Sequence, residues 1–372
     1  MPSHKSVLIV NTGSSSLKWV VLDARSEAIQ QQGDATWYAS EPGRHEREVT
    51  AALREAPKVD AGGHRVVHGG TRFRDSVLID DRVREEIGKL AELAPLHNPA
   101  ALGGIDAAVA RFPGLPQVAS FDTAFHAGIP DAAAIYPLPW HWTERWELRR
   151  FGFHGLSVAY SLRRTRELLG ALPSRVVVCH LGAGCSVTAV SSGQSVSTSM
   201  GFTPLEGLMM ARRSGSVDPG LLLFLLNRRG IDPSDLDHAL NERSGLVGVS
   251  GVSADMREVL AAADRGADRA VLARDIFVHR LIATVGAMVA TLRGLDALVF
   301  TGGIGEHSPP IRAAVCEGFG YVGLTLESAL NTARDGDDRD VATPGSAVKV
   351  LVIAAREDLT ILGEVKRVLG WE

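Results

Sequence analysis

The sequence has only three cysteines, Cys179, Cys185 and Cys316, and it has no CxxC pair. An odd number of cysteines without a framework spacing argues against a disulfide scaffold and fits a reducing cytosol. The absence of a CxxC pair argues against a structural zinc site. We therefore expect a cytoplasmic protein without disulfide bonds.

A surplus of positive charge is also missing, since the formal net charge is -4. A nucleic-acid-binding protein would show a basic surplus, so we expect no nucleic-acid partner. The apolar run before Asn11 is too short for a signal peptide. No stretch approaches the roughly 18 apolar residues that cross a bilayer, so we expect no membrane partner.

The chain has 372 residues, of which 45% are hydrophobic and 22% are charged. This composition is ordinary for a globular protein, and the length suits two domains better than one small core. If such a mildly acidic protein acts on an anion, its positive charge must be concentrated locally.

A strand–turn–strand pattern begins near the N-terminus. The apolar stretch 7–10 predicts a buried strand, 11–16 is a polar turn with glycine and serine, and 17–22 predicts a second strand. Small residues in the turn let backbone N–H groups approach an anion.

The same pattern recurs about 170 residues later, with apolar stretches at 176–179 and 187–190 around a glycine-bearing turn at 180–186. Gly13 and Gly182 occupy matching places in the two turns. Two turns of this size indicate a duplicated α/β fold with a cleft between the halves. The alternative, that two unrelated hairpins look alike, stays open at this point.

Apolar periodicity predicts helices and strands between and after these hairpins. The helix at 268–292 is long and apolar on one side, which suits either a dimer interface or a plain core helix. The expected helices are 81–94, 99–112, 155–169 and 268–292, and the expected later strands are 297–300 and 348–353.

The turn N-T-G-S-S-S-L-K carries hydroxyl groups and one cation that suit phosphate. Ser14, Ser15 and Ser16 can donate hydrogen bonds to phosphate oxygens, and Lys18 adds positive charge. The spacing of a Walker A loop is absent. Alone, this segment fits an ordinary polar hairpin equally well.

Several loops between strands and helices carry charged or imidazole side chains. Arg65 in G-H-R-V-V-H-G-G can bind a carboxylate or phosphate with its planar fork. His97 precedes a helix start, Asp122 and His126 lie in F-D-T-A-F-H, and His154 lies in R-R-F-G-F-H-G. A lone histidine is usually structural, but this recurrence favours a functional site.

The second half adds further polar segments. The stretch 199–219 has too many Gly, Met and Ser residues for a simple surface helix, and it contains Arg212 and Arg213. The T-G-G-I-G-E segment follows an apolar strand, so its glycines can bring a nucleotide close to the backbone. Glu357 follows the last strand and either faces magnesium or is solvent-exposed.

Taken together, these motifs resemble the acetate kinase family over nearly the whole chain. The resemblance implies an α/β fold of two duplicated ribonuclease-H-like (actin-like ATPase) domains with an interdomain nucleotide cleft. It implies residues 1–126 plus 360–372 as an N-terminal acyl and phosphate domain with a returning C-terminal helix. Residues 127–359 would form the nucleotide-binding and dimerisation domain, and the protein would be a homodimer.

The resemblance also implies the reaction and its participants. The γ-phosphoryl group of ATP would move reversibly to acetate, giving acetyl phosphate and ADP, with Mg²⁺ or Mn²⁺ as the metal. Propionate or another short carboxylate is the alternative acceptor. A sugar kinase of the same superfamily and a non-enzymatic nucleotide switch are the more remote readings.

Carried over residue by residue, the resemblance assigns roles to this chain. Asp122, His154 and Arg213 would be catalytic, Asn11 and Glu357 would hold the metal, and Arg65 and His97 would bind the acceptor. The acyl pocket would comprise Val67, Leu96, Phe153 and Pro204. The nucleotide would contact Ser14, Ser16, Lys18, His180, Leu181, Gly182, Ala183, Gly184, Asp255, Met256, Arg257, Gly303, Ile304, Gly305, Glu306 and His307.

Three departures from the family pattern bear on the nucleotide. Ala183 and His307 stand where many relatives have asparagine, and Arg356 and Asp358 flank Glu357 where relatives often have N-E-E. None removes a catalytic position. Filling the acyl pocket with Val67 favours a two-carbon acid, because propionate-preferring relatives tend to have a smaller residue there.

Overall fold

The computed structural model describes residues 5–13, 16–37, 44–95, 97–333 and 338–371, with the side chains of residues 44–46 left undescribed. The chain divides into two compact units. Unit 1 comprises residues 1–127, 153–160 and 356–372, and unit 2 comprises 128–152 and 161–355. The predicted domain boundaries stay a prediction; unit 1 adds residues 127, 153–160 and 356–359 to the first predicted domain.

Unit 1 is a six-stranded sheet with the order β3-β2-β1-β4-β6-β5. β1, β2 and β3 are antiparallel neighbours, whereas β4 and β6 run parallel to β1. The elements are β1 (Ser6–Thr12), β2 (Ser16–Asp23), β3 (Ile29–Thr36), α1 (Arg44–Arg54), β4 (Ala61–Val66), β5 (Val77–Leu78), α2 (Asp81–Lys89), α3 (Asn98–Arg111), β6 (Gln117–Phe121) and α15 (Glu357–Leu369).

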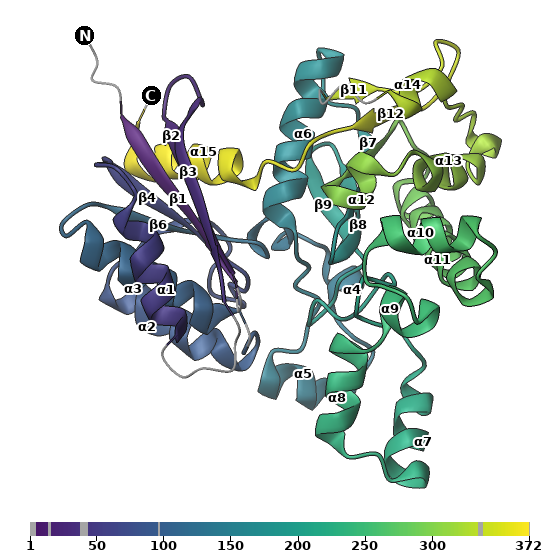
Figure 1. Ribbon diagram of the computed structural model, residues 1–372, viewed down its shortest axis with the longest axis horizontal. Coiled ribbons are helices and arrows are strands. Elements are labelled where there is room, and N and C mark those ends of the chain that lie inside the picture. Colours follow the sequence, from purple (N-terminus) through teal and green to yellow (C-terminus); the bar gives the residue numbers. More distant parts are fainter. Residues whose placement is uncertain (1–4, 14–15, 38–43, 96, 334–337, 372) are drawn as a thin grey trace. The chain divides into compact units, whose positions relative to one another are not determined.

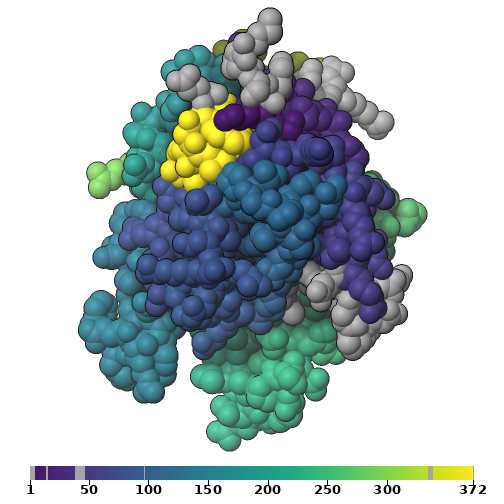
Figure 2. Space-filling model, turned by 90° about the vertical axis from the view of Figure 1, so that its left-hand side faces the viewer, coloured from purple at the N-terminus to yellow at the C-terminus, as the bar shows by residue number. Residues whose placement is uncertain are grey.

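Helices cover both faces of this sheet (Figure 1). Leu8 and Val10 of β1 belong to the core that includes Val49 and Leu53 of α1, so α1 and α3 lie on one face. A Cβ at Gly63 of β4 would meet Ile361 of α15, which packs on the other face. Figure 2 shows α15, in yellow, against the blue and purple surface of the same unit.

Unit 2 repeats this topology. Its strand order is β11-β12-β10-β7-β8-β9, and read from the other end it matches β3-β2-β1-β4-β6-β5 strand for strand. β7, β8 and β9 are antiparallel neighbours, and β10 and β12 are parallel to β7. The predicted α/β fold with a duplicated core is therefore confirmed.

The remaining helices and strands lie in unit 2, apart from the first part of α6. α6 runs from unit 1 into unit 2. The helices are α4 (Asp131–Ala134), α5 (Trp140–Trp146), α6 (Gly155–Leu169), α7 (Pro219–Arg229), α8 (Pro233–Glu242), α9 (Gly245–Ser250), α10 (Met256–Asp264), α11 (Asp268–Leu292), α12 (Gly302–His307), α13 (Pro309–Glu317) and α14 (Ser328–Thr332). The strands are β7 (Arg175–Leu181), β8 (Cys185–Ser191), β9 (Gln194–Thr198), β10 (Ala297–Thr301), β11 (Arg339–Asp340) and β12 (Lys349–Val352).

α11 is long and apolar enough to cross a membrane by length and composition, with a mean hydropathy of 1.5 over 18 residues. We expected no stretch with a composition close to that of a bilayer-crossing helix, and α11 shows that this expectation was wrong. The buried residues Phe277, Leu281 and Val285 recur at the spacing of one helical face. The mid-helix side chains Arg274, Asp275 and Arg280 are not buried, so the helix has the amphipathic pattern of a core helix.

Candidate active site

The β1–β2 turn is closed by a hydrogen bond from the backbone N–H of Gly13 to the carbonyl of Ser16, 2.7 Å long. Asn11 and Lys18 are cross-strand partners, so their side chains share one face of the sheet. Lys18 is exposed and can meet an anion there. Ser14, which was also predicted to bind phosphate, lies outside the described residues.

Arg65 and Asp122 meet at the same edge of the sheet in unit 1. Arg65 is near the carboxyl end of β4, and Asp122 directly follows β6, the parallel neighbour of β4. The Nε atom of Arg65 donates to Oδ1 of Asp122 at 3.0 Å, and Nη2 donates to Oδ2 at 2.5 Å. The Asp122 side chain is only 1% exposed, so this two-point contact fixes the guanidinium plane.

Two more oxygen-bearing groups surround the same guanidinium. Nη1 of Arg65 donates to Oδ1 of Asn11 at 3.2 Å, and Nε lies 3.4 Å from Oε2 of Glu357 at the start of α15. Burial lowers the pKa of Arg65, but the carboxylates of Asp122 and Glu357 raise it, and the net shift is upward. Arg65 is therefore a permanent cation.

The oxygen atoms around Arg65 also fit a magnesium ion. Mg²⁺ is usually held by one or two carboxylates together with substrate phosphates and water. Asn11 and Glu357 supply such hard oxygen donors beside the Arg65 guanidinium, whereas both carboxylate oxygens of Asp122 accept hydrogen bonds from Arg65. No group of three or more His, Cys, Asp or Glu side chains forms a protein-only cage in the described ranges. The donor set thus suits a metal that arrives with a nucleotide.

Glu357 lies between two charged residues that pair with each other. Arg356 and Asp358, which depart from the family pattern, pair with each other, with Nη2 and Oδ2 2.8 Å apart. Their charges are satisfied locally. Glu357 itself contacts the Arg65 guanidinium.

Val67 and Phe153, two predicted acyl-pocket residues, are both buried in unit 1. The ring of Phe153 makes an edge contact with His68, next to Val67, with ring centroids 5.5 Å apart. Pro204, a third predicted pocket residue, is half-buried in unit 2. Leu96 lies outside the described residues.

Asn98 anchors the loop after β4, a role that the sequence did not reveal. Its side chain is fully buried; Nδ2 donates to the carbonyl of His68 at 3.0 Å, and Oδ1 accepts from the N–H of His68 at 3.2 Å. His97, a predicted acceptor-binding residue, precedes it at the start of α3. An asparagine before proline gave no signal of this contact, because its partner lies 30 residues away in sequence.

His154 has a left-handed backbone, with φ of 61°. Such a conformation costs free energy in a residue other than glycine and often occurs at functional sites. The next residue has no room for a side chain, since a Cβ at Gly155 would lie 2.3 Å from the carbonyl oxygen of Asp122. This close approach places the start of α6 beside the Asp122 loop.

His126 is a structural histidine. It is buried, its Nε2 lies 3.0 Å from the carbonyl oxygen of Phe153, and burial lowers its pKa to about 4. The ring is neutral near pH 7. It therefore supports the backbone next to His154 and carries no charge.

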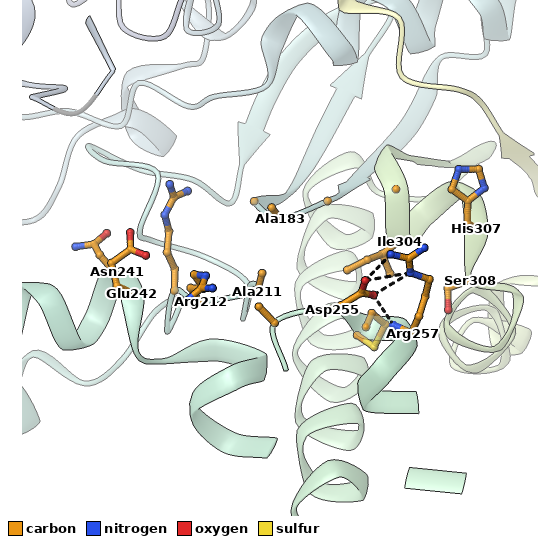
Figure 3. A pocket seen from close by; sticks show the side chains of 16 residues that line it. Ala183, Ala211, Arg212, Asn241, Glu242, Asp255, Arg257, Ile304, His307 and Ser308 are labelled. Atoms are coloured by element: carbon orange, nitrogen blue, oxygen red, sulfur yellow. Dashed lines mark hydrogen bonds and ion pairs between the residues drawn. The ribbon is translucent and has the colours of Figure 1, made fainter. Parts of the chain in front are cut away.

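Unit 2 contains a cavity of about 740 Å³ between the β7–β8 turn, α8, α10 and α12. Figure 3 shows Ala183 at the β7–β8 turn, Arg212 and Glu242 on one side, and Ile304 and His307 on the other. The predicted residues that line it are Gly182, Ala183, Gly184, Arg213, Asp255, Met256, Arg257, Gly303, Ile304 and His307.

Of the thirteen predicted nucleotide residues in unit 2, four are absent from the cavity lining, namely His180, Leu181, Gly305 and Glu306. Leu181 is fully buried at the end of β7. Oε1 of Glu306 accepts from the N–H of Ala355 at 3.0 Å, so this side chain holds the strand-to-helix connection. These observations favour a supporting role in the cavity wall for Leu181 and Glu306.

The Arg213 side chain places a positive charge in the cavity wall. Burial lowers its pKa, and the carboxylate of Glu242, with the Cys185 thiol, opposes that shift. Glu242 and Asn241 line the cavity from the end of α8, and neither was predicted from sequence. Their segment matches none of the motifs that indicated the other site residues, so only the tertiary structure reveals them.

Asp255 and Arg257 are tied together at the cavity edge (Figure 3). Asp255 caps α10 by accepting from the backbone N–H of Arg257 at 2.8 Å, and its Oδ2 accepts from Nη2 of Arg257 at 2.5 Å. The side-chain hydrogen bond from Arg257 lowers the pKa of Asp255. This carboxylate therefore fixes the helix start that faces the cavity.

Comparison with known proteins is consistent across sequence and structure. The chain matches the model of the acetokinase family over residues 44–363. An acetate kinase of Nostoc punctiforme is 52% identical over 84% of this chain and 77% of the relative. An acetate kinase of a Synechococcus strain is 45% identical over 99% of this chain and 100% of the relative.

Solved structures agree. The crystal structure of Porphyromonas gingivalis acetate kinase is similar with a TM-score of 0.90 and 34% identity, covering 98% of this chain and 100% of that chain. A propionate kinase from Francisella tularensis gives a TM-score of 0.88 and 35% identity, covering 97% and 98%. The duplicated α/β fold and the matching sequence lead to one conclusion: the chain belongs to the acetokinase family.

Proposed function

We propose that this protein is a phosphotransferase that moves the γ-phosphoryl group of ATP to acetate, giving acetyl phosphate and ADP in a reversible reaction. The observation that carries the proposal is the Arg65 guanidinium, fixed by Asp122 and flanked by Asn11 and Glu357. This guanidinium is held in a fixed orientation and offers a positive charge to an anionic acceptor. The relatives named acetate kinase support the same acceptor.

Acetate is already ionised near neutral pH, because carboxylic acids titrate near pH 4–5. It therefore needs no general base. The obstacle is the approach of one anion to another, since unit charges 4 Å apart repel by about 4 kcal/mol at an effective dielectric constant near 20. The site must cancel this repulsion and align the acetate oxygen with the phosphorus atom.

In the proposed reaction an acetate oxygen forms a bond to the γ-phosphorus, and the bond from that phosphorus to the β–γ bridging oxygen breaks. Arg65 and Arg213 orient the acceptor and stabilise the charge on the transferring group. His154 donates a hydrogen bond to an equatorial phosphoryl oxygen. Asp122 holds the Arg65 plane in place.

Mg²⁺ or Mn²⁺, bound with ATP, would neutralise phosphate charge when present. Asn11 and Glu357 would hold it directly or through water. Lys18 would bind a phosphate group from the β1–β2 turn. The glycines of the β7–β8 turn and of α12 would let the nucleotide approach the backbone in unit 2.

The proposal is tested by trapping acyl phosphate with hydroxylamine while the purified enzyme, ATP and Mg²⁺ are mixed with different acceptors. Acetate should give the highest kcat/KM for hydroxamate formation, propionate a lower one and butyrate the lowest. Glycerol, followed by ADP release, is the control for a sugar-kinase activity. ADP release with glycerol and none with the acids would overturn the proposal.

The Val67 side chain carries the proposed preference for acetate over propionate. One methylene group in an apolar pocket is worth about 1–3 kcal/mol, so propionate should be a poor second substrate. Val67→Ala should raise the ratio of kcat/KM for propionate to that for acetate by about tenfold. An unchanged ratio, with both activities retained, would show that Val67 does not limit the size of the acid.

We also propose a cytoplasmic homodimer. The three cysteines are free, as expected in a reducing compartment. None of the residues of α7, all of which the structure describes, is buried, and Leu221, Leu223 and Phe224 are 46%, 58% and 43% exposed. Such a helix suits a second copy of the chain. Sedimentation velocity should give twice the chain mass, and a monomer at micromolar concentration would contradict this.

A further inference from the structure

Arg312 in α13 is a buried cation outside the cavity lining. It is 0% exposed and is among the largest fully buried side chains. Nε donates to Oδ1 of Asn331 at 2.8 Å and Nη2 to the Asn331 carbonyl at 2.6 Å. Nη1 donates to the carbonyls of Gly305 and Glu306, both at 2.8 Å. No carboxylate in the described part of the chain pairs with it.

Stability alone does not explain an arginine at this position. Burial lowers the pKa of Arg312 to about 10, and the nearby Arg339 adds to the effect, so the group stays charged near pH 7. Burying a charge without a counter-ion is costly, and well-packed apolar residues are often at least as stabilising. The guanidinium offsets this cost through the hydrogen bonds that it donates to the Asn331 side chain and to three backbone carbonyl groups.

Those carbonyl groups belong to two different elements. Gly305 and Glu306 lie in the last turn of α12, where helix carbonyls lack partners within the helix and a cation is favourable. Asn331 belongs to α14, and its Nδ2 also donates to the carbonyl of Pro309, the first residue of α13, at 3.0 Å. The Arg312–Asn331 pair therefore joins α12, α13 and α14.

α12 forms a wall of the cavity, through Gly303, Ile304 and His307, and Ser308 follows it (Figure 3). The start of α12 is fixed by a tight turn, since Gly302 has φ of 76° and a Cβ there would lie 2.9 Å from the carbonyl oxygen of Leu181. Its other end is held by Arg312. The two ends together set how this wall faces the cavity.

We propose that the Arg312–Asn331 pair positions α12 for nucleotide binding, so that Arg312 acts on the ligand through the helix and not by contact. The inference rests on the proposed function for the identity of the ligand, a nucleoside phosphate. Loosening the pair would let the end of α12 move without changing any group that faces the acceptor in unit 1.

The test is the affinity for ADP, measured by calorimetric titration of the whole enzyme with Mg²⁺. Arg312→Lys keeps the charge but loses the fork, and should weaken ADP binding about tenfold. The KM for acetate should change less than about twofold, because that side of the reaction is untouched. Asn331→Ala should weaken ADP binding in the same direction, and the double variant should be no weaker than the stronger single one.

Leu292→Ala is the matched control for lost stability. Leu292 is buried at the end of α11, just before the amino end of β10, whereas α12 follows the carboxyl end. The Leu292→Ala variant should have a lower Tm than the wild type and the same affinity for ADP. If Arg312→Lys and Asn331→Ala also lower Tm without weakening ADP binding, the inference is wrong.

The outcomes separate this inference from the proposed function. A wild-type enzyme that binds ADP but phosphorylates no short acid would overturn the function and leave the inference testable by affinity. A wild-type enzyme that binds no ADP would overturn both. If Arg312→Lys does not fold, Asn331→Ala decides the inference alone, since it removes a neutral side chain.

Discussion

Replacing Arg65 by alanine should lower kcat/KM for acetate by about 10³-fold, the order of magnitude seen when a cation that stabilises a transferring phosphoryl group is removed. The loss has two sources. The acceptor loses its cation, and the 1% exposed carboxylate of Asp122 loses its partner. The measurement is steady-state hydroxamate formation with acetate as the varied substrate.

Two variants isolate the geometry of Arg65 from its charge and from general damage. Arg65→Lys keeps the charge but cannot make the two-point contact with Asp122, so it should recover only part of the lost activity. Arg84→Ala removes an exposed ion pair with Asp106 in the same unit and should leave kcat/KM unchanged. An Arg65→Ala enzyme with more than about a tenth of the wild-type kcat/KM would contradict this account.

Asp122→Asn should lower kcat by about 10²-fold while leaving the Mg²⁺ concentration for half-maximal activity unchanged. The side chain keeps its volume but loses the charge and one acceptor oxygen facing Arg65. The guanidinium then loses its fixed plane, although Asn11 and Glu357 still contact it. The measurement is kcat as a function of Mg²⁺ at saturating ATP and acetate.

The double variant Arg65→Lys/Asp122→Asn checks that the two residues act as one unit. Its loss should be clearly smaller than the product of the two single losses. Near-full turnover of Asp122→Asn with intact Mg²⁺ dependence would show that Asp122 does not position Arg65. A large rise in the Mg²⁺ requirement would instead assign Asp122 to the metal.

Local patterns predicted much of the fold. The helices at 155–169 and 268–292 end where the sequence placed them. Gly170 follows the first with φ of 77°, and Arg293, with φ of 56°, caps the second in the same left-handed conformation. The helix predicted at 81–94 ends earlier, at Lys89, and continues as a short 3-10 turn at 90–92. The predicted repetition of the hairpin is also confirmed. β1 and β2 occupy the same two places in the first sheet as β7 and β8 occupy in the second.

The site could be predicted only in part. Arg65 and Asp122 carry recognisable motifs, and strand order brings them together. Glu242 and Arg312 carry no local signal, because their importance depends on elements distant in sequence. The left-handed backbone of His154 and the close approach of Gly155 to the Asp122 carbonyl likewise carry no local sequence signal. Tertiary packing decides these features.

The central claim, phosphoryl transfer from ATP to a carboxylate, is tested most directly by ³¹P NMR of the enzyme with ATP, Mg²⁺ and acetate. The account predicts a new acetyl phosphate resonance that grows as the γ-phosphate signal of ATP falls, with ADP formed in equal amount and the transfer slowed about 10³-fold in Arg65→Ala. Conversion of ATP to ADP and orthophosphate at the same rate with and without acetate would contradict it.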